Sequence, residues 1–163
     1  AGGTKETVRY AADTDSVLLL VDTTTPAVTP VIYDVASGYD VITNFTTGED
    51  KIELSSALGL GTGDARTAIT GKGVIAADGG ADTNAEIAAT LQTLIGTGAD
   101  FFNDGTTDRA VAAATYDDTT AAEDFVMLFI DTDADGDFTL GTDQAIMLAG
   151  IASTPVVSDI VFG

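Results

Sequence analysis

The chain has 163 residues, and 45% of them are apolar, which is too many for a disordered segment. Its 26 acidic and six basic side chains give a formal net charge of −20, and this charge excludes nucleic acid and anionic membrane surfaces as partners. The chain has no His and no Cys, so the usual ligands of zinc and iron–sulfur clusters and the His-dependent nucleophile triads are missing. We therefore predict that the chain is not an enzyme, and that divalent cations or a salty medium offset its carboxylate charge.

No stretch of 18 consecutive apolar residues exists, so the sequence predicts no transmembrane segment. The first residues, 1–4, do not resemble a secretory signal peptide. We expect any export signal to have been removed already or to lie at the other end of the chain.

Short runs of β-branched and aromatic residues occupy the first 60 residues, and turn-forming residues separate them. The clearest run is 51–54, where polar and apolar residues alternate with the period of a half-buried strand. Two prolines mark the segment 22–30 as a loop or a sheet edge. The strands predicted in this part cover residues 4–10, 16–21, 31–35, 39–45 and 51–54.

A Gly-rich loop at 57–65 and a short strand pair at 67–76 follow. One amphipathic helix is predicted near 84–95, because a capping box from Thr83 to Glu86 precedes apolar residues that recur at helical spacing. The apolar face of this helix comprises Ile87, Leu91, Leu94 and Ile95. Residues 109–116 could form a strand or a helix, and we favour a strand; the apolar runs 125–130 and 144–151 are further strands, and 156–162 is a final strand or an apolar tail.

Together these elements predict a mainly β fold, a short-strand module of the β-roll or β-sandwich kind with one amphipathic helix near 84–95. We divide the chain into an N-terminal segment, 1–60, and a distal β-rich segment, 61–163, which carries the helix and an Asp-rich loop. We expect the two segments to pack as one unit. No repeat of 20–50 residues is evident.

The sharpest chemical signal is the Asp-rich segment 131–143, which joins the two apolar runs 125–130 and 144–151. Calcium takes about six to eight oxygen ligands, and acids at alternate positions of a tight loop converge on one point. Gly136, at the sixth position, permits the sharp turn that such a loop needs. We therefore predict a calcium site whose ligands are Asp131, Asp133, Asp135, Asp137 and Asp143.

This loop departs from an EF-hand, which carries a bidentate acid at its twelfth position. Here the twelfth residue is Thr142, and the acid, Asp143, comes one residue later. Because the flanking segments also look like strands, we interpret 131–143 as a calcium loop between strands. The alternative is an acidic, solvated turn, since Asp and Gly favour turns without any ion. That interpretation is preferred for the other Asp clusters, which comprise Asp13, Asp15, Asp104, Asp108, Asp117 and Asp118.

Residues 39–55, YDVITNFTTGEDKIELS, carry a second signal. This run resembles the signature D-x-I-x-[DN]-F-x-x-G-x-D-K-I-[DE]-L-S that closes the β-rolls of RTX-type (hemolysin-type calcium-binding) proteins. Members of that family are exported by type I secretion and include surface-layer proteins, adhesins and serralysin-like enzymes. The run 5–10, KETVRY, resembles the K-D-T-F-V-Y strand of the same family. Within the run 39–55, the residues that match the first signature are Asp40, Ile42, Asn44, Phe45, Gly48, Asp50, Lys51, Ile52, Glu53, Leu54 and Ser55.

The resemblance implies a parallel β-roll end that holds calcium between its turns. It carries over Asp40 and Asp50 as calcium ligands, with Glu6 and Asn44 as further candidates. The alternative is a plain strand–turn–strand whose acids face solvent. The family's nonapeptide repeat, G-G-x-G-x-D-x-U-x, is not present in full, so a long stack of calcium ions is not expected within this chain.

Residues 125–162 resemble the distal domain of many type I secretion substrates. The shared features are an apolar strand, a D-x-[DN]-x-D-G loop, an acid, an I-x-L-x-G-[IV] strand and an apolar end. The resemblance implies export through an ABC-type channel that reads an uncleaved C-terminal signal, here 158–163. Counted over 1–56 and 125–163, the family resemblance covers about half of the chain and leaves the middle unassigned.

Two functions fit these features. The first is an extracellular, calcium-binding structural module of a secreted or cell-surface protein, of the S-layer, fibre or adhesin type. Such a module would fold with calcium after export and could associate with itself through exposed edge strands. The second is a C-terminal secretion and folding domain that belongs to a larger RTX enzyme, a protease or lipase. The lack of a catalytic constellation fits both functions.

Overall fold

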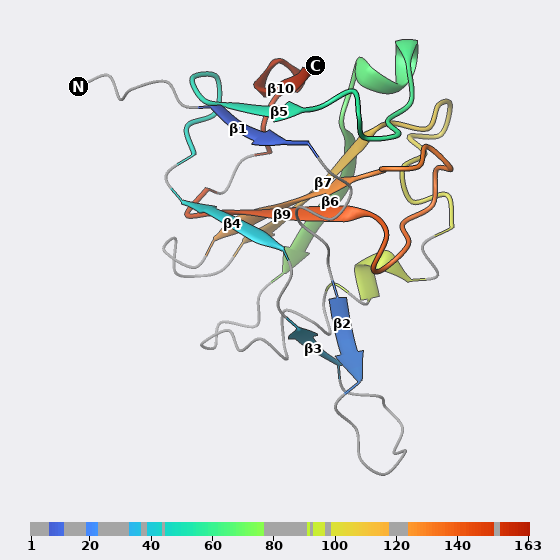
Figure 1. The fold of residues 1–163 in the computed structure, drawn as a ribbon. Coiled ribbons are helices and arrows are strands. Elements are labelled where there is room, and N and C mark those ends of the chain that lie inside the picture. Colours follow the sequence, from blue (N-terminus) through green and yellow to red (C-terminus); the bar gives the residue numbers. More distant parts are fainter. Residues whose placement is uncertain are drawn as a thin grey trace, which may run out of the picture.

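A computed structural model gives the fold (Figure 1). It describes residues 7–11, 19–22, 33–36, 39–43, 45–76, 91, 93–96, 99–117, 124–151 and 154–163. The fold is mainly β, as the sequence predicts. Among the described residues, the strands form a three-stranded sheet, a five-stranded sheet and a two-stranded pair of β2 (Leu19–Asp22) with β3 (Tyr33–Ala36).

The three-stranded sheet brings the first and the last described strands together. Its central strand, β5 (Lys51–Leu54), pairs in parallel with β1 (Thr7–Tyr10) on one side and with β10 (Ile160–Phe162) on the other. Ile52 and Leu54 are fully buried, whereas Lys51 and Glu53, which alternate with them, are partly exposed. The predicted alternation of β5 is therefore confirmed, and it turns one face of the sheet toward the core.

The five-stranded sheet has the order β4-β9-β8-β7-β6. Its three central strands are antiparallel, and each edge strand pairs in parallel with its neighbour. All six residues of β8 are buried, because alternate side chains enter apolar clusters on both faces of the sheet. The strands are β4 (Asp40–Thr43), β6 (Thr70–Ala76), β7 (Val111–Asp117), β8 (Phe125–Ile130) and β9 (Gln144–Ala149).

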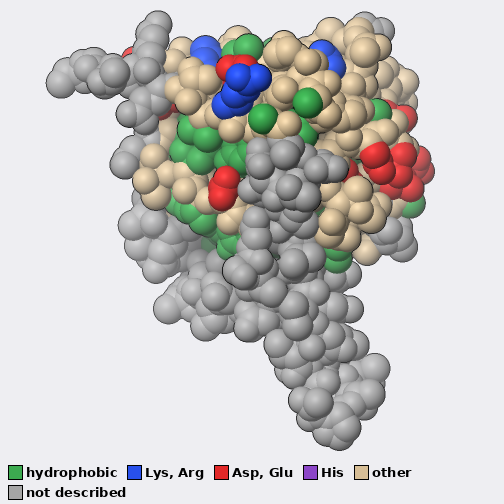
Figure 2. Space-filling view, in the orientation of Figure 1, with side chains coloured by type: hydrophobic (Ala, Val, Ile, Leu, Met, Phe, Trp, Pro, Cys, Tyr) green, Lys and Arg blue, Asp and Glu red, His purple; other side chains and the backbone are tan. Residues whose placement is uncertain are grey.

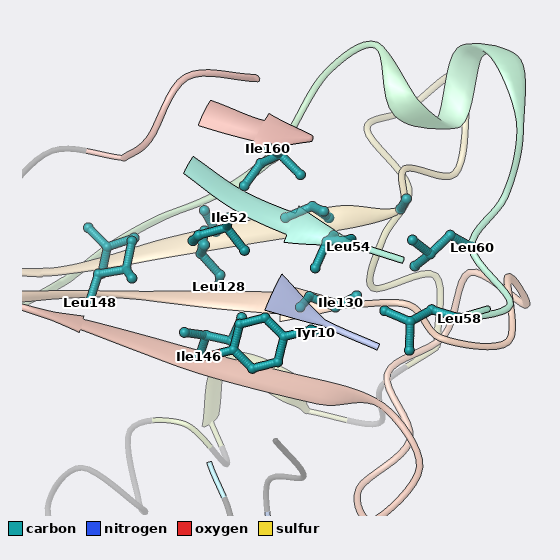
Figure 3. Close-up of a cluster of buried hydrophobic side chains, with 14 of the residues drawn as sticks. Tyr10, Ile52, Leu54, Leu58, Leu60, Leu128, Ile130, Ile146, Leu148 and Ile160 are labelled. Atoms are coloured by element: carbon teal, nitrogen blue, oxygen red, sulfur yellow. The ribbon is translucent and has the colours of Figure 1, made fainter. Parts of the chain in front are cut away.

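The first apolar cluster lies between the two larger sheets, so these sheets pack as a sandwich (Figure 3). Ile52, Leu54 and Ile160 point from the three-stranded sheet toward Leu128 and Ile146 of the five-stranded sheet. The core therefore combines residues from the beginning, the middle and the end of the chain.

The second cluster covers the other face of the five-stranded sheet. Phe101 packs edge-on against Phe129 of β8, with ring centroids 5.0 Å apart. Leu91 and Ile95 join this cluster from the end of a helix, of which residues 91 and 93–95 are described. The rest of the predicted helix, 84–90, lies outside the described residues. No helix in the described part of the chain is long and apolar enough to cross a membrane.

The segment 67–76 differs from its prediction. A short strand pair around residues 71–73 is predicted there, but Thr70–Ala76 is a single strand, β6. Gly73 adopts the left-handed conformation, with φ of +84°, and the register with β7 shifts between Gly71 and Val74. The Gly residues that were expected to form a turn therefore lie in a bulge within the strand. The Gly-rich loop before it contains a short 3-10 helix, η1 (Gly63–Arg66).

Leu128→Ala tests the central core. Leu128 is 1% exposed and packs between the two sheets, so the substitution is expected to lower the free energy of unfolding by about 2–5 kcal/mol. Val41→Ala is the control, because Val41 lies on the edge strand β4 and is 52% exposed; a change below about 0.5 kcal/mol is expected. Urea unfolding measures both, and equal losses would contradict the assignment of the core.

Candidate metal centre

The Asp-rich loop 131–143 connects β8 to β9, which are antiparallel neighbours in the middle of the five-stranded sheet. Their last pair is Ile130 with Gln144. Asp131 directly follows β8 and Asp143 directly precedes β9, so the hairpin register sets these two acids opposite each other. The register explains why the second acid stands one residue later than an EF-hand requires.

Three carboxylates converge at this point. Ligand oxygens of Asp131, Asp133 and Asp143 all lie within 4.8 Å of one another. Calcium–oxygen distances of about 2.3–2.6 Å allow two ligands of one ion to lie up to about 5 Å apart, so one calcium ion can contact all three. Asp143 is 0% and Asp131 is 2% exposed, whereas Asp133 lies at the surface.

Backbone amides hold the Asp131 carboxylate in place. Its Oδ1 accepts a hydrogen bond from the Ala134 amide at 2.7 Å, and its Oδ2 accepts one from the Gly136 amide at 3.1 Å. Ala134 and Gly136 have φ of 58° and 84°, and these left-handed conformations wrap the loop around the carboxylate. A carboxylate has about four acceptor positions, so roughly two remain for a cation.

The Asp143 carboxylate is held more tightly. Its Oδ1 accepts from the amide and the hydroxyl of Thr132, at 2.9 and 3.0 Å, and its Oδ2 accepts from the Thr139 amide at 2.8 Å. Roughly one acceptor position is left for a cation. Both buried carboxylates are thus oriented by the loop itself.

The burial of these acids perturbs their ionisation. Desolvation, aided by the neighbouring carboxylates of Asp143 and Asp133 and opposed by two backbone amides, raises the pKa of Asp131 to about 6. Desolvation also raises the pKa of Asp143. None of the ion pairs in the described part of the chain includes either acid. Burial thus disfavours the charged form of both acids, and a cation bound between them would offset that cost.

The other two acids predicted in the loop point elsewhere. Asp135 is exposed, and its Oδ1 accepts from the Asp137 amide at 2.9 Å. The Oδ1 of Asp137 accepts from the Asp100 amide at 2.7 Å. The structure does not bring Asp135 or Asp137 into the group of three, and their role as ligands stays a prediction.

Asp108, for which a solvated turn is predicted, is exposed and lies beside the loop. The structure places its carboxyl carbon 3.0 Å from where a Cβ on Gly136 would stand, and the Phe102 amide donates to the Gly136 carbonyl at 2.9 Å. The loop 99–110 therefore packs directly on the Asp-rich loop. Figure 2 shows acidic side chains gathered at the end of the molecule where these two loops lie in Figure 1.

A pocket of about 440 Å³ lies beside the loop, with both Asp108 and Asp131 in its lining. Asp131 and Ala134 form part of its wall, and η1 and the loop before it form another part. Its lining residues are Gly61, Thr62, Ala65, Thr107, Asp108, Arg109, Asp131 and Ala134.

The acids suggested by the family resemblance do not assemble in the same way. Asp40 begins β4 and is exposed, and Asp50 precedes β5, where its Oδ2 accepts from the Thr46 amide at 2.8 Å. In the described part of the chain, neither belongs to a group of three acids close enough to share an ion. Glu6 and Asn44 lie outside the described residues.

Comparison with protein-family models and with curated proteins found no match to this chain. The resemblance to RTX-type proteins therefore stays a prediction from the residues quoted above.

Gly59→Ala tests how closely the loop 55–61 packs on the metal centre. A Cβ on Gly59 would overlap the backbone carbonyl oxygen of Thr132, so the loop must shift; we expect a loss of about 1–3 kcal/mol in the free energy of unfolding. Gly71→Ala is the matched control, because a Cβ there meets no atom within 4 Å. Chemical unfolding measures both. A Gly59→Ala protein as stable as the control would contradict this close approach.

The raised pKa of Asp131 predicts how the stability of the metal-free chain depends on pH. The unfolded Asp has a pKa of about 3.9, so between pH 5 and 7 the folded chain holds more protons at Asp131 than the unfolded chain does. Stability in EDTA should therefore fall as the pH rises through about 6. The chain has no His to obscure this window.

Melting temperatures in EDTA at pH 5, 6 and 7 measure this dependence, and saturating calcium should abolish it by binding the ionised carboxylates. Asp131→Asn should flatten the EDTA profile, since the substituted side chain cannot titrate. A wild-type melting temperature that rises from pH 5 to 7 in EDTA would contradict the assignment.

Proposed function

We propose that the chain is an extracellular calcium-binding structural module of a secreted or cell-surface protein, of the S-layer, fibre or adhesin type. One observation carries the proposal. Two carboxylates with almost no exposure, Asp131 and Asp143, converge with Asp133 at the closed end of a core hairpin, and no described basic side chain pairs with them.

The donor set favours calcium over other metals. The three converging groups are all carboxylates, which are hard oxygen ligands, and the chain has no His or Cys to favour zinc or copper. Calcium accepts an irregular shell in which backbone carbonyls and water complete the coordination, whereas magnesium demands a near-octahedral one. The exposed side chain of Asp133 and the adjoining pocket leave room for such water ligands.

The position of the centre favours a structural role. β8 and β9 are central strands of the five-stranded sheet, and their side chains belong to both apolar clusters. An ion that relieves the repulsion between Asp131 and Asp143 stabilises the hairpin, and through it both cores. Calcium binding is then linked to folding, so the chain would be less stable where calcium is scarce and more stable outside the cell.

Export and assembly belong to the same proposal, and the sequence resemblance supports them. The end of the chain would be read by an ABC-type channel, and the folded modules would associate with one another at the cell surface. Calcium would favour that association by lowering the repulsion between chains that each carry a net charge of −20.

Calcium is expected to raise the melting temperature of the wild-type chain at pH 7. Extracellular calcium sites have dissociation constants of about 10⁻⁴–10⁻³ M, and a concentration of about 100 times that constant adds about 2.7 kcal/mol of stability. Differential scanning calorimetry in EDTA and in excess calcium, with titration calorimetry for the stoichiometry, measures the effect. An unchanged melting temperature would mean that 131–143 is an ordinary acidic turn that does not bind calcium.

A pair of loop variants locates the ion. Asp133→Ala removes the exposed member of the group of three, and it should abolish most of the calcium response while leaving the metal-free fold intact. Asp135→Ala removes the same charge from the same loop outside that group, and it should keep most of the response. An equal loss of the calcium response in both variants would add Asp135 to the ligands. Full retention of the response in both variants would exclude a calcium site in this loop.

A further inference from the structure

The Asp-rich loop is joined to loop 99–110 by hydrogen bonds at two adjacent residues. The Gly136 carbonyl accepts from the Phe102 amide at 2.9 Å, and the Oδ1 of Asp137 accepts from the Asp100 amide at 2.7 Å. One of these acceptors belongs to the backbone and the other to a side chain, so together they fix both the position and the direction of the Asp-rich loop at this point. Asp137 therefore has a defined partner outside its own loop.

Loop 99–110 is itself anchored in the second apolar cluster. Phe101 and Phe102 are buried there, and their rings lie against Phe138 of the Asp-rich loop, with centroids 5.4 and 6.2 Å apart. The Phe102 carbonyl accepts hydrogen bonds from Thr70 Oγ1 at 2.8 Å and from the Arg109 amide at 3.0 Å. The amides that loop 99–110 donates to the Asp-rich loop thus come from a well-packed support.

The backbone of Asp100 is in an uncommon conformation. Its φ is 54°, which lies in the left-handed region that few residues other than Gly adopt, although Asp and Asn tolerate it best. The hydrogen bond that its amide donates to Asp137 offsets part of the cost of this conformation. Loop 99–110 and the Asp137 carboxylate therefore stabilise each other.

The two contacts lead directly to a candidate calcium ligand. Gly136, whose carbonyl is held by Phe102, donates its own amide to the Oδ2 of Asp131 at 3.1 Å. Asp131 is 2% exposed and belongs to the group of three carboxylates. A displacement of residues 136 and 137 would therefore move a donor that orients this carboxylate.

From these contacts we propose that Asp137 is a positioning residue of the metal centre, whose carboxylate holds the Asp-rich loop against loop 99–110 and so sets Asp131 for calcium. The inference rests on the calcium binding proposed above, and it differs from the ligand role that the sequence predicts for Asp137. The acceptor oxygen of Asp137 matters here, and its charge does not. Because the contact exists before an ion binds, the loop loses less conformational freedom on binding.

Calcium titration calorimetry on folded chains, at pH 7 and about 0.15 M salt, tests the proposal. Asp137→Ala removes the acceptor, and it should weaken calcium binding about tenfold, a factor that corresponds to about 1.4 kcal/mol and to one hydrogen bond. Asp137→Asn removes the charge but keeps a carbonyl oxygen that can accept from the Asp100 amide, and its affinity should stay within about threefold of the wild type.

Asp100→Asn is the matched control for charge. It removes a neighbouring carboxylate at an exposed position, keeps the backbone amide, and introduces a residue that also tolerates the left-handed conformation. Its calcium affinity should stay within about threefold of the wild type, because only the backbone of Asp100 takes part in the contact.

Hydrogen–deuterium exchange in EDTA measures the contact without metal. The Asp100 amide should exchange at least about tenfold faster in Asp137→Ala than in the wild type or in Asp137→Asn, while the amides of β8 and β9 keep their rates. If Asp137→Ala does not fold, the wild type decides alone. Its Asp100 amide in EDTA should exchange at least about tenfold more slowly than the same amide in an unstructured peptide.

Three outcomes would overturn the proposal while leaving calcium binding intact. A loss of affinity in Asp137→Asn as large as in Asp137→Ala would make Asp137 a ligand. Unchanged affinity in both variants would remove any role for Asp137, and an Asp100 amide that exchanges freely in the metal-free wild type would show that the contact does not exist before the ion binds. A wild-type chain that binds no calcium would overturn the proposed function and this inference together.

Discussion

The burial of two like charges at the closed end of the β8–β9 hairpin is the constraint on which this structure depends. Asp131 and Asp143 follow directly from the last pair of the two strands that build both apolar clusters. The chain cannot bury these strands fully without also burying the two acids beside them. Hydrogen bonds from the loop orient the carboxylates but do not neutralise them, and the calcium proposed above would offset their charge.

The rest of the molecule supports that hairpin from several sides. Phe138 lies within the loop, and its ring packs edge-on against Phe129 of β8, with centroids 5.2 Å apart. Gly59 lets the loop 55–61 reach the backbone of Thr132, and Asp108 stands against Gly136. The candidate metal centre therefore packs against the core at one end of the sandwich.

The two larger sheets differ in how far apart in the sequence their paired strands lie. The five-stranded sheet is stabilised by antiparallel pairs between neighbours in sequence, whereas the three-stranded sheet joins the two ends of the described chain through β5. Contacts between distant parts of a chain form only after a long loop has closed, and the entropy of that closure opposes them. Asp159 offsets part of this cost by bringing its own charge-assisted hydrogen bonds to the meeting point.

The sequence by itself determined the mainly β class, the alternation of β5, the apolar runs that became β8 and β9, and the Asp-rich loop between them, because each depends on residues close together in the chain. It also singled out Asp131, Asp133 and Asp143, although it could not separate them from Asp135 and Asp137, which have the same local pattern. Only the tertiary structure decided that separation, through a hairpin register that sets Asp131 against Asp143 and turns Asp137 toward Asp100. The approach of Gly59 and Asp108 to the loop and the donors of Asp159 leave no signal in the sequence, because those groups meet only when distant segments pack together.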